Sequence, residues 1–226
     1  MRKLSIGIFV SGEGTTLRSV NEAIKNGILQ MDIDFVLINK SQENSNELTN
    51  YCQDNNLNII HRPYDFTNGN RDNYLSGIVT ELDSYNSQFY FFLGWNMIVN
   101  EQFISSSPRI LNLHPSLPNS FVGSNCIRLA YDAFQINEIS ETGSMVHEVT
   151  PVLDRGKVYG STIVEIYEND SYEELKSRVK NYEKGLVVGV LQNEISVFNS
   201  NLSNSTQHGN EDYVGKVRTV SDIGYG

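Results

Sequence analysis

The residues best suited to chemistry follow an apolar run in the middle of the chain, Ile110-Leu111-Asn112-Leu113-His114-Pro115. If this run is a strand, alternation places Asn112 and His114 on the same face. An amide donor and an imidazole at this spacing suit a reaction at a carbonyl, because Asn112 can stabilise a developing oxyanion and His114 can transfer a proton. The residue types alone leave a second interpretation open, in which Asn112 caps a turn and His114 is a buried structural histidine.

A carboxylate that could assist His114 lies in Val152-Leu153-Asp154-Arg155-Gly156, a loop between two apolar runs. Beside His114, Asp154 would hold the tautomer of the imidazole and favour its protonated form. An exposed aspartate in a turn is the ordinary interpretation of such a loop. The local sequence therefore predicts either a surface aspartate or a buried partner of His114.

A glycine-containing turn, Ser11-Gly12-Glu13-Gly14-Thr15-Thr16, stands between the first apolar run and a helical pattern. Backbone N–H groups at such a helix start can bind a phosphate, although a plain tight turn would have a similar composition. The turn lacks the spacing of a GxGxxG fingerprint, and the chain has no GxxxxGK[ST] motif. Neither NAD nor ATP is indicated.

The elements that must position these residues alternate between short apolar runs and helical patterns in the first half of the chain. This alternation predicts parallel strands joined by crossover helices, that is, an α/β fold with a doubly wound, mostly parallel sheet. The expected strands are Leu4–Val10, Phe35–Ile38, Asn58–His61, Phe89–Leu93 and Ile110–Leu113, and the expected helices are Thr16–Asn26, Asn46–Asn55 and Asn70–Tyr85.

The second half is richer in strands. After a loop over Pro115–Ser124, the pattern predicts a helix through Phe134 and two strands, Gly143–Val149 and Val158–Ile166, which flank the loop of Asp154. A last helix is expected from Ser171, as N-cap, to about Leu191. Glu173 and Glu174 then lie in its first turn, where the helix dipole favours acids.

The end of the chain changes composition. Beyond Phe198, residues 199–210 are mostly Asn, Ser, Thr and Gln, which bury too little apolar surface to offset the entropy of ordering. We therefore predict a catalytic domain over residues 1–198 and a polar linker or tail over residues 199–226.

Composition narrows the class of partner. The 226 residues suit one α/β domain, and 17 basic against 27 acidic residues give a net charge of −10, which disfavours nucleic acid. Cys52 and Cys126 are far apart and outside any metal-ligand spacing, so we expect free thiols and no metal. No apolar run is long enough to span a membrane and no secretory signal is present, so a cytoplasmic protein with small-molecule substrates is expected.

Three segments together resemble one enzyme family. SGEGTTL, ILNLHPSLP and TGSMVHEVTPVLDRG are similar in order and spacing to glycinamide ribonucleotide formyltransferases, over about residues 3–195. This resemblance to the folate-dependent formyltransferase superfamily implies a Rossmann-like formyltransferase fold. It also implies transfer of a formyl group from 10-formyltetrahydrofolate to the amine of glycinamide ribonucleotide in purine synthesis, without a metal, by a monomer or a homodimer.

The resemblance also implies roles for individual residues. The implied residues are catalytic Asn112, His114 and Asp154; substrate-binding Gly12, Gly14, Thr15, Thr16 and Glu183; and folate-binding Trp95, Asn96, Met97, Ile98, Val99, Val152, Leu153 and Asp154. The chain departs from the family in three places. Glu13 stands where many members have Asn or Ser, Thr16 stands where many have Asn, and Asn96-Met97 stands where bacterial members commonly have Met-Arg.

Other functions remain open at this stage. A sugar N-formyltransferase would share the Asn-His-Asp trio, and a non-catalytic folate or nucleotide binder would share the fold. Tyr213–Gly226 resembles the opening of SAICAR synthetase, which implies a possible covalent fusion to a second purine-synthesis enzyme, although a basic β-hairpin would fit the same residues.

Overall fold

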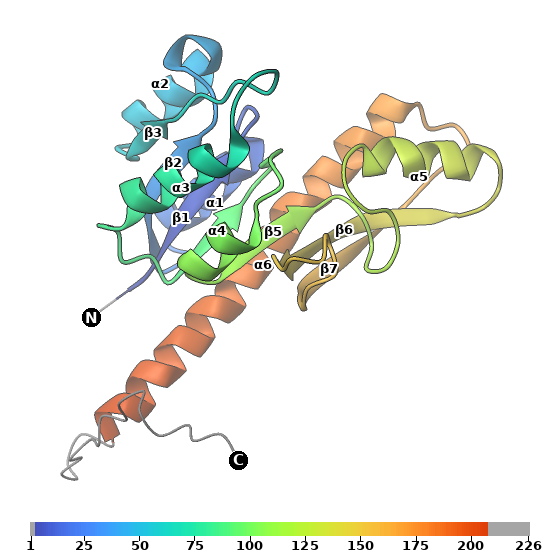
Figure 1. Ribbon diagram of the computed structural model, residues 1–226. Coiled ribbons are helices and arrows are strands. Elements are labelled where there is room, and N and C mark those ends of the chain that lie inside the picture. Colours follow the sequence, from blue (N-terminus) through green and yellow to red (C-terminus); the bar gives the residue numbers. More distant parts are fainter. Residues whose placement is uncertain (1–2, 208–226) are drawn as a thin grey trace, which may run out of the picture.

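The computed structural model describes residues 3–207 and contains one seven-stranded sheet (Figure 1). The strand order is β3-β2-β1-β4-β5-β6-β7. The first five strands pair in parallel, and β6 and β7 extend the sheet as antiparallel strands. The strands are β1 Leu4–Val10, β2 Met31–Ile38, β3 Ile59–His61, β4 Phe89–Phe92, β5 Ile110–His114, β6 Glu141–Glu148 and β7 Val158–Glu165. The predicted fold class is confirmed.

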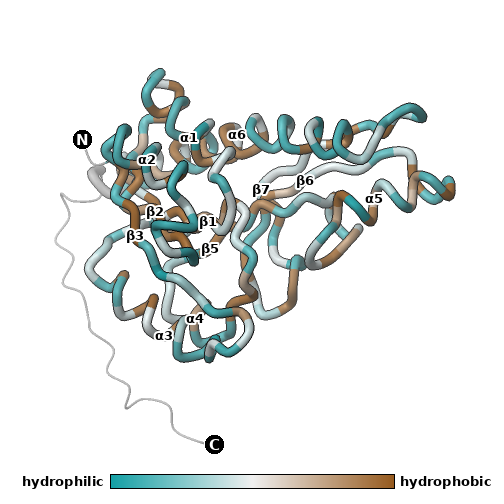
Figure 2. Tube along the Cα trace, turned by 90° about the horizontal axis from the view of Figure 1, so that it is seen from above, coloured by the Kyte–Doolittle hydropathy of each residue, from teal (hydrophilic) through white to brown (hydrophobic). Residues whose placement is uncertain are grey.

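Helices cover both faces of the sheet. The helices are α1 Thr15–Lys25, η1 Gln42–Ser45, α2 Asn46–Asp54, α3 Arg71–Leu82, α4 Glu101–Ser106, α5 Cys126–Gln135 and α6 Tyr172–Gln207. Side chains of α1, α2 and α6 pack on one face, and those of α3 and α4 pack on the other. A smaller apolar cluster joins α5, β7 and the first turns of α6. Hydrophobic segments gather around β1, β2 and β5 (Figure 2).

Alternation along β1 divides its side chains between the two faces. Ile6, Ile8 and Val10 join the core under α1 and α6, and Phe9 joins the aromatic core of the other face. Gly7 lies on the side of Phe9, where a Cβ atom would stand 2.1 Å from the Phe35 ring. Glycine at this position therefore makes room for a buried aromatic side chain of the neighbouring strand.

Side-chain caps define several helix starts. Asn70 accepts a hydrogen bond from the N–H of Asn73, and Asn100 accepts one from the N–H of Phe103. Ser171 and Glu174 form a reciprocal capping box, in which Ser171 Oγ accepts from the Glu174 N–H and Glu174 Oε2 accepts from the Ser171 N–H. The predicted N-cap at Ser171 is confirmed.

The predicted end of the last helix, near Leu191, is wrong. α6 continues to Gln207, so residues 199–207 are helical where a linker was expected. Its extension passes beyond the sheet (Figure 1). The polar composition of this part of α6 reflects its exposure to solvent. The hydroxyls of Ser196, Ser200 and Ser203 donate to carbonyls one turn earlier and therefore compete little with the backbone hydrogen bonds of the helix. Residues 208–226, with the segment similar to SAICAR synthetase, lie outside the described residues.

Two further differences concern short elements. β2 begins at Met31, earlier than the expected Phe35, because Met31 is already buried at the start of the pairing with β1. The short helix α4 was not predicted, although its cap, Asn100, is a recognisable start signal.

No helix within residues 3–207 is long and apolar enough to cross a membrane. Within the same residues, no group of three or more His, Cys, Asp or Glu side chains could hold a metal ion.

The contact of Gly7 with Phe35 generates a stability prediction. We expect Gly7→Ala to destabilise the fold by about 1–3 kcal/mol, because the added methyl group must displace a ring in a close-packed core. A matched control is Gly185→Ala in α6, where a Cβ atom would meet nothing within 4 Å. The control should stabilise the protein by up to about 1 kcal/mol through helix propensity. Urea unfolding of both variants measures the difference, and equal stabilities would contradict the packing argument.

Candidate active site

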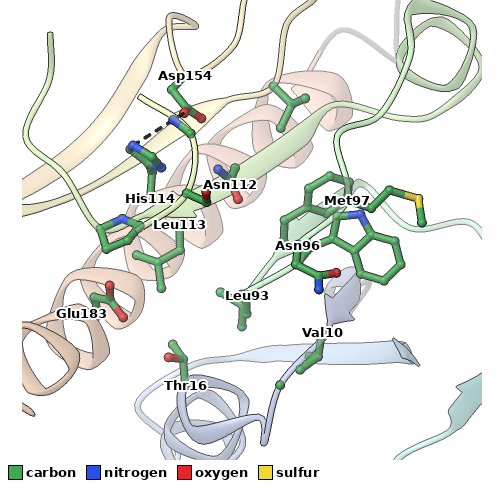
Figure 3. Close-up of a pocket in the computed structure, with 18 of the residues that line it drawn as sticks. Val10, Thr16, Leu93, Asn96, Met97, Asn112, Leu113, His114, Asp154 and Glu183 are labelled. Atoms are coloured by element: carbon green, nitrogen blue, oxygen red, sulfur yellow. Dashed lines mark hydrogen bonds and ion pairs between the residues drawn. The ribbon is translucent and has the colours of Figure 1, made fainter. Parts of the chain in front are cut away.

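A cavity of about 950 Å³ opens at the carboxyl ends of the parallel strands. This edge is where open α/β sheets place their ligands. Its lining includes Gly12 after β1, Lys40 after β2, Trp95 after β4, His114 at the end of β5, Asp154 after β6 and Glu183 on α6. Residues far apart in the sequence therefore meet in one site (Figure 3).

The antiparallel strand β6 brings a second histidine to this site. Asn112 on β5 lies directly opposite His147 on β6 in the strand register. Their side chains meet, with Asn112 Nδ2 3.2 Å from His147 Nε2. His147 Nδ1 lies 2.9 Å from the carbonyl of Glu148 and therefore carries a proton. One N–H of the Asn112 amide faces His147 Nε2, and the second N–H remains for a ligand.

Asp154 holds the two histidines and a third segment together. Its Oδ1 lies 3.4 Å from His147 Nε2, and its Oδ2 lies 3.6 Å from His114 Nε2 (Figure 3 draws the latter pair). The Gly123 N–H donates to Oδ2 over 2.8 Å. The side chain is buried and the backbone is left-handed, with φ of 52°, a conformation that Asp tolerates better than most residues. The alternative of an exposed turn aspartate is therefore wrong.

The contacts of His114 indicate where its proton lies. His114 is 4 % exposed, and its Nε2 donates to the Phe121 carbonyl over 2.9 Å. Within residues 3–207, the hydrogen bonds and ion pairs of this side chain all involve Nε2. Nδ1 is thus the ring atom that remains for a ligand, as an acceptor in the neutral ring and as a donor in the charged ring.

The pKa values of two acidic groups of the site, Asp154 and Cys126, are shifted in opposite directions. Burial acts to raise the pKa of Asp154, but hydrogen bonds from His147 and the Gly123 N–H, with the charges of both histidines, hold it below its ordinary value. Cys126, whose Sγ is 3.6 Å from His114 Nε2, has its pKa raised to about 11 by burial and by the charge of Asp154. Cys126 is therefore a neutral thiol at pH 7, while Asp154 is a carboxylate.

One end of the cavity is built from the start of α1 and from α6. Gly14 begins α1 in a left-handed conformation, with φ of 70°, and no side chain caps the first helical N–H groups. Thr15 and Thr16 line this end. At the same end, the fully buried Glu183 accepts from Ser144 Oγ over 3.1 Å and pairs with Lys180 Nζ over 2.9 Å. Figure 3 places Thr16 and Glu183 on the same side of the cavity.

The other end is mostly apolar. Trp95, Met97, Ile98, Val99 and Leu153 line it, together with Asn96. Asn96 is held in place by two hydrogen bonds, from Asn39 Nδ2 to its Oδ1 and from its N–H to Ser11 Oγ. Trp95 packs edge-on against Phe9 and is also part of the aromatic core.

The structure brings together the residues proposed from the sequence, with one exception. The side chain of Val152 is 64 % exposed and does not line the cavity. Sequence reasoning missed His147, Ser144 and the lysines Lys40, Lys176 and Lys180. His147 had a usable signal, because it lies in TGSMVHEV, the predicted strand that precedes the loop of Asp154.

Fold and site together define an α/β protein whose strand ends present an amide, an imidazole and a carboxylate to a two-ended cavity, an arrangement suited to acyl chemistry. The family model for formyl transferases matches residues 4–191. The chain therefore belongs to the formyl transferase family.

Individual relatives agree with this assignment. A phosphoribosylglycinamide formyltransferase of Dictyostelium discoideum is 29% identical over 199 residues, covering 82% of this chain and 96% of that protein. A trifunctional purine biosynthetic protein of Gallus gallus is 27% identical over 191 residues, covering 84% of this chain and 18% of its own length. The solved phosphoribosylglycinamide formyltransferase of Coxiella burnetii, in complex with CHES, has a TM-score of 0.75 at 27% identity, covering 86% of this chain and 88% of that one.

The lowered pKa of Asp154 predicts a dependence of stability on pH. Because the folded-state pKa lies below the ordinary 3.8, the ionised carboxylate stabilises the fold at higher pH. This contribution is lost as the pH falls from the ordinary pKa through the folded-state value.

We expect the Asp154→Asn variant to be less stable than the wild type at pH 6. When the pH is lowered from 4 to 2, the melting temperature of the variant should fall less than that of the wild type. Melting temperatures of both proteins across this range measure the effect. Parallel curves for the two proteins would contradict the assignment of the shift to Asp154.

Proposed function

We propose that this chain transfers the formyl group of 10-formyltetrahydrofolate to the amine of glycinamide ribonucleotide. The proposal rests on one observation. Asn112, His114 and Asp154 lie together in one cavity, where its apolar end meets its polar end. A flat, uncharged pterin suits the end that contains Trp95 and Met97. A phosphorylated ribose suits the end that contains the start of α1 and Glu183.

The proposed reaction needs no covalent intermediate with the protein. The lone pair of the acceptor amine attacks the formyl carbon, and the electrons of the C=O bond move to oxygen. The free N–H of Asn112 and a protonated His114 Nδ1 donate to the resulting oxyanion. Re-formation of C=O breaks the bond to folate N10, which takes up a proton as the former amine loses one.

Asp154 acts on this reaction through His114 and His147. A fixed carboxylate beside both rings favours the charged imidazolium during the reaction and limits ring rotation. Glu183, with its oxygens held by Ser144 and Lys180, has the geometry to accept hydrogen bonds from ribose hydroxyls.

The proposal includes the organisation of the chain. We assign the catalytic domain to residues 1–198, a boundary that lies within α6, which continues to Gln207, and we expect a monomer or a homodimer. Fusion of this domain to other enzymes occurs in the trifunctional relative, and residues 199–226 are proposed to lead into a second purine-synthesis domain in the same way.

The acceptor is tested by assaying formyl transfer from 10-formyltetrahydrofolate to glycinamide ribonucleotide, to an amino-sugar nucleotide and to water. We expect glycinamide ribonucleotide to be formylated fastest, since Glu183 and the start of α1 provide partners for ribose and phosphate. Faster formylation of the amino sugar would assign a sugar N-formyltransferase. Binding of both substrates without turnover would assign a non-catalytic binder.

The catalytic assignment is tested by Asn112→Ala and His114→Ala. We expect loss of the Asn112 donor to cost about 3 kcal/mol of transition-state stabilisation and loss of His114 to lower kcat by about 10²- to 10⁴-fold. Cys126→Ala, which removes a neutral thiol beside His114, is the matched control and should retain most activity. Near wild-type kcat in either test variant, with the fold confirmed by circular dichroism, would contradict the mechanism.

A further inference from the structure

Three lysines line the cavity, and they differ in how their charges are compensated. Lys180 pairs with the buried Glu183 over 2.9 Å, and Lys176 pairs with Glu173 over 3.1 Å. Lys40 also lines the cavity but has no carboxylate within 4.0 Å among the residues that the structure describes. Lys40 is thus the cavity lysine that can bind an anion without first giving up an ion pair.

A hydrogen-bond network fixes the backbone next to Lys40. The preceding residue, Asn39, is 3 % exposed and donates to Asn96 Oδ1 over 2.8 Å. The Asn96 N–H donates to Ser11 Oγ over 3.0 Å, and the Ser11 N–H donates to the Gly94 carbonyl over 3.2 Å. The ends of β2, β1 and β4 are therefore tied together, which places Lys40 next to the loop that begins at Gly12.

The same loop requires a positive charge if it is to hold a phosphate. Glu13 lines the cavity within this loop, and its carboxylate opposes the approach of an anion. The first N–H groups of α1 supply only partial positive charge. Lys180 is neutralised by Glu183, so its attraction for a further anion is reduced.

We propose that Lys40 is a specificity-determining residue that binds the phosphate of the acceptor at the end of the cavity that contains the start of α1. The inference rests on the proposed function, because it takes a phosphorylated ribose as the occupant of this end. It adds a residue that follows β2 to an end of the cavity otherwise formed by the start of α1 and by α6. Lys40 acts in binding and takes no part in the transfer of the formyl group.

The test is a calorimetric titration of the wild type, Lys40→Met and Lys40→Arg with glycinamide ribonucleotide and with the same compound lacking its phosphate. We expect Lys40→Met to weaken binding of the phosphorylated compound by about 10- to 100-fold, as for loss of a hydrogen bond to a charged group. Binding of the dephosphorylated compound should not change. Lys40→Arg should recover most of the affinity.

Lys184→Met is the matched control, because Lys184 is also half-buried on the described chain but does not line the cavity. It should bind like the wild type. Equal affinity of wild type and Lys40→Met for the phosphorylated compound would overturn the proposal. An equal loss of affinity of Lys40→Met for the compound with and without its phosphate would also overturn it. A loss of affinity of Lys40→Met for 10-formyltetrahydrofolate alone would overturn it as well.

Titration also separates this inference from the proposed function. If the wild type binds glycinamide ribonucleotide without formylating it, the proposed reaction is wrong and the role of Lys40 is still decided by the affinities. If the wild type does not bind the compound, both proposals are wrong.

Discussion

The site depends on one buried carboxylate. Asp154 would be costly to bury alone, and three groups from separate segments compensate it: His114 on β5, His147 on β6 and the N–H of Gly123 in the loop before α5. Each of these contacts also fixes its own segment. Removal of the charge would leave two imidazole rings and a loop without the partner that determines their relative positions, so organisation of the site and protonation of Asp154 are coupled.

The sheet topology explains why the carboxylate can reach both histidines. The parallel strands end at one edge, which presents Asn112 and His114 to the cavity. β6 then runs antiparallel to β5 and ends near the opposite end of β5, and its following loop returns over the strand ends with Asp154 in a left-handed conformation. Gly156 permits this return, because a Cβ atom there would lie 1.9 Å from the carbonyl oxygen of Glu148. The left-handed backbone of Asp154 and the close approach of Gly156 to Glu148 together determine where the side chain of Asp154 lies.

Much of this arrangement could be predicted from the sequence because it depends on local rules. Period-two alternation identified β1 and β5 and placed Asn112 and His114 on one face, and an N-cap serine followed by acids in the first turn identified the start of α6. The end of α6 could not be predicted in this way, since Asn and Ser disfavour helices only weakly and nothing between Gly189 and Gln207 breaks one. The burial of Asp154 was also undecided, because it depends on pairing between β5 and β6 and on the loop of Gly123, which are long-range features.

The distribution of charge within the cavity depends on residues far apart in the sequence, so it follows from local sequence rules less than any other feature of the site. Lys40 follows β2, whereas Lys176 and Lys180 lie on α6, more than a hundred residues further along the sequence, and only the structure tells which of them is paired. The pairing of Lys180 with Glu183 serves two purposes, since it lowers the cost of burying Glu183 and orients an acceptor toward the cavity. The attraction of an anion at this end of the cavity is left to the start of α1 and to Lys40, which has no carboxylate within 4.0 Å among the described residues. Lys40 follows the neighbouring strand, β2, and lies outside the group formed by Asn112, His114 and Asp154.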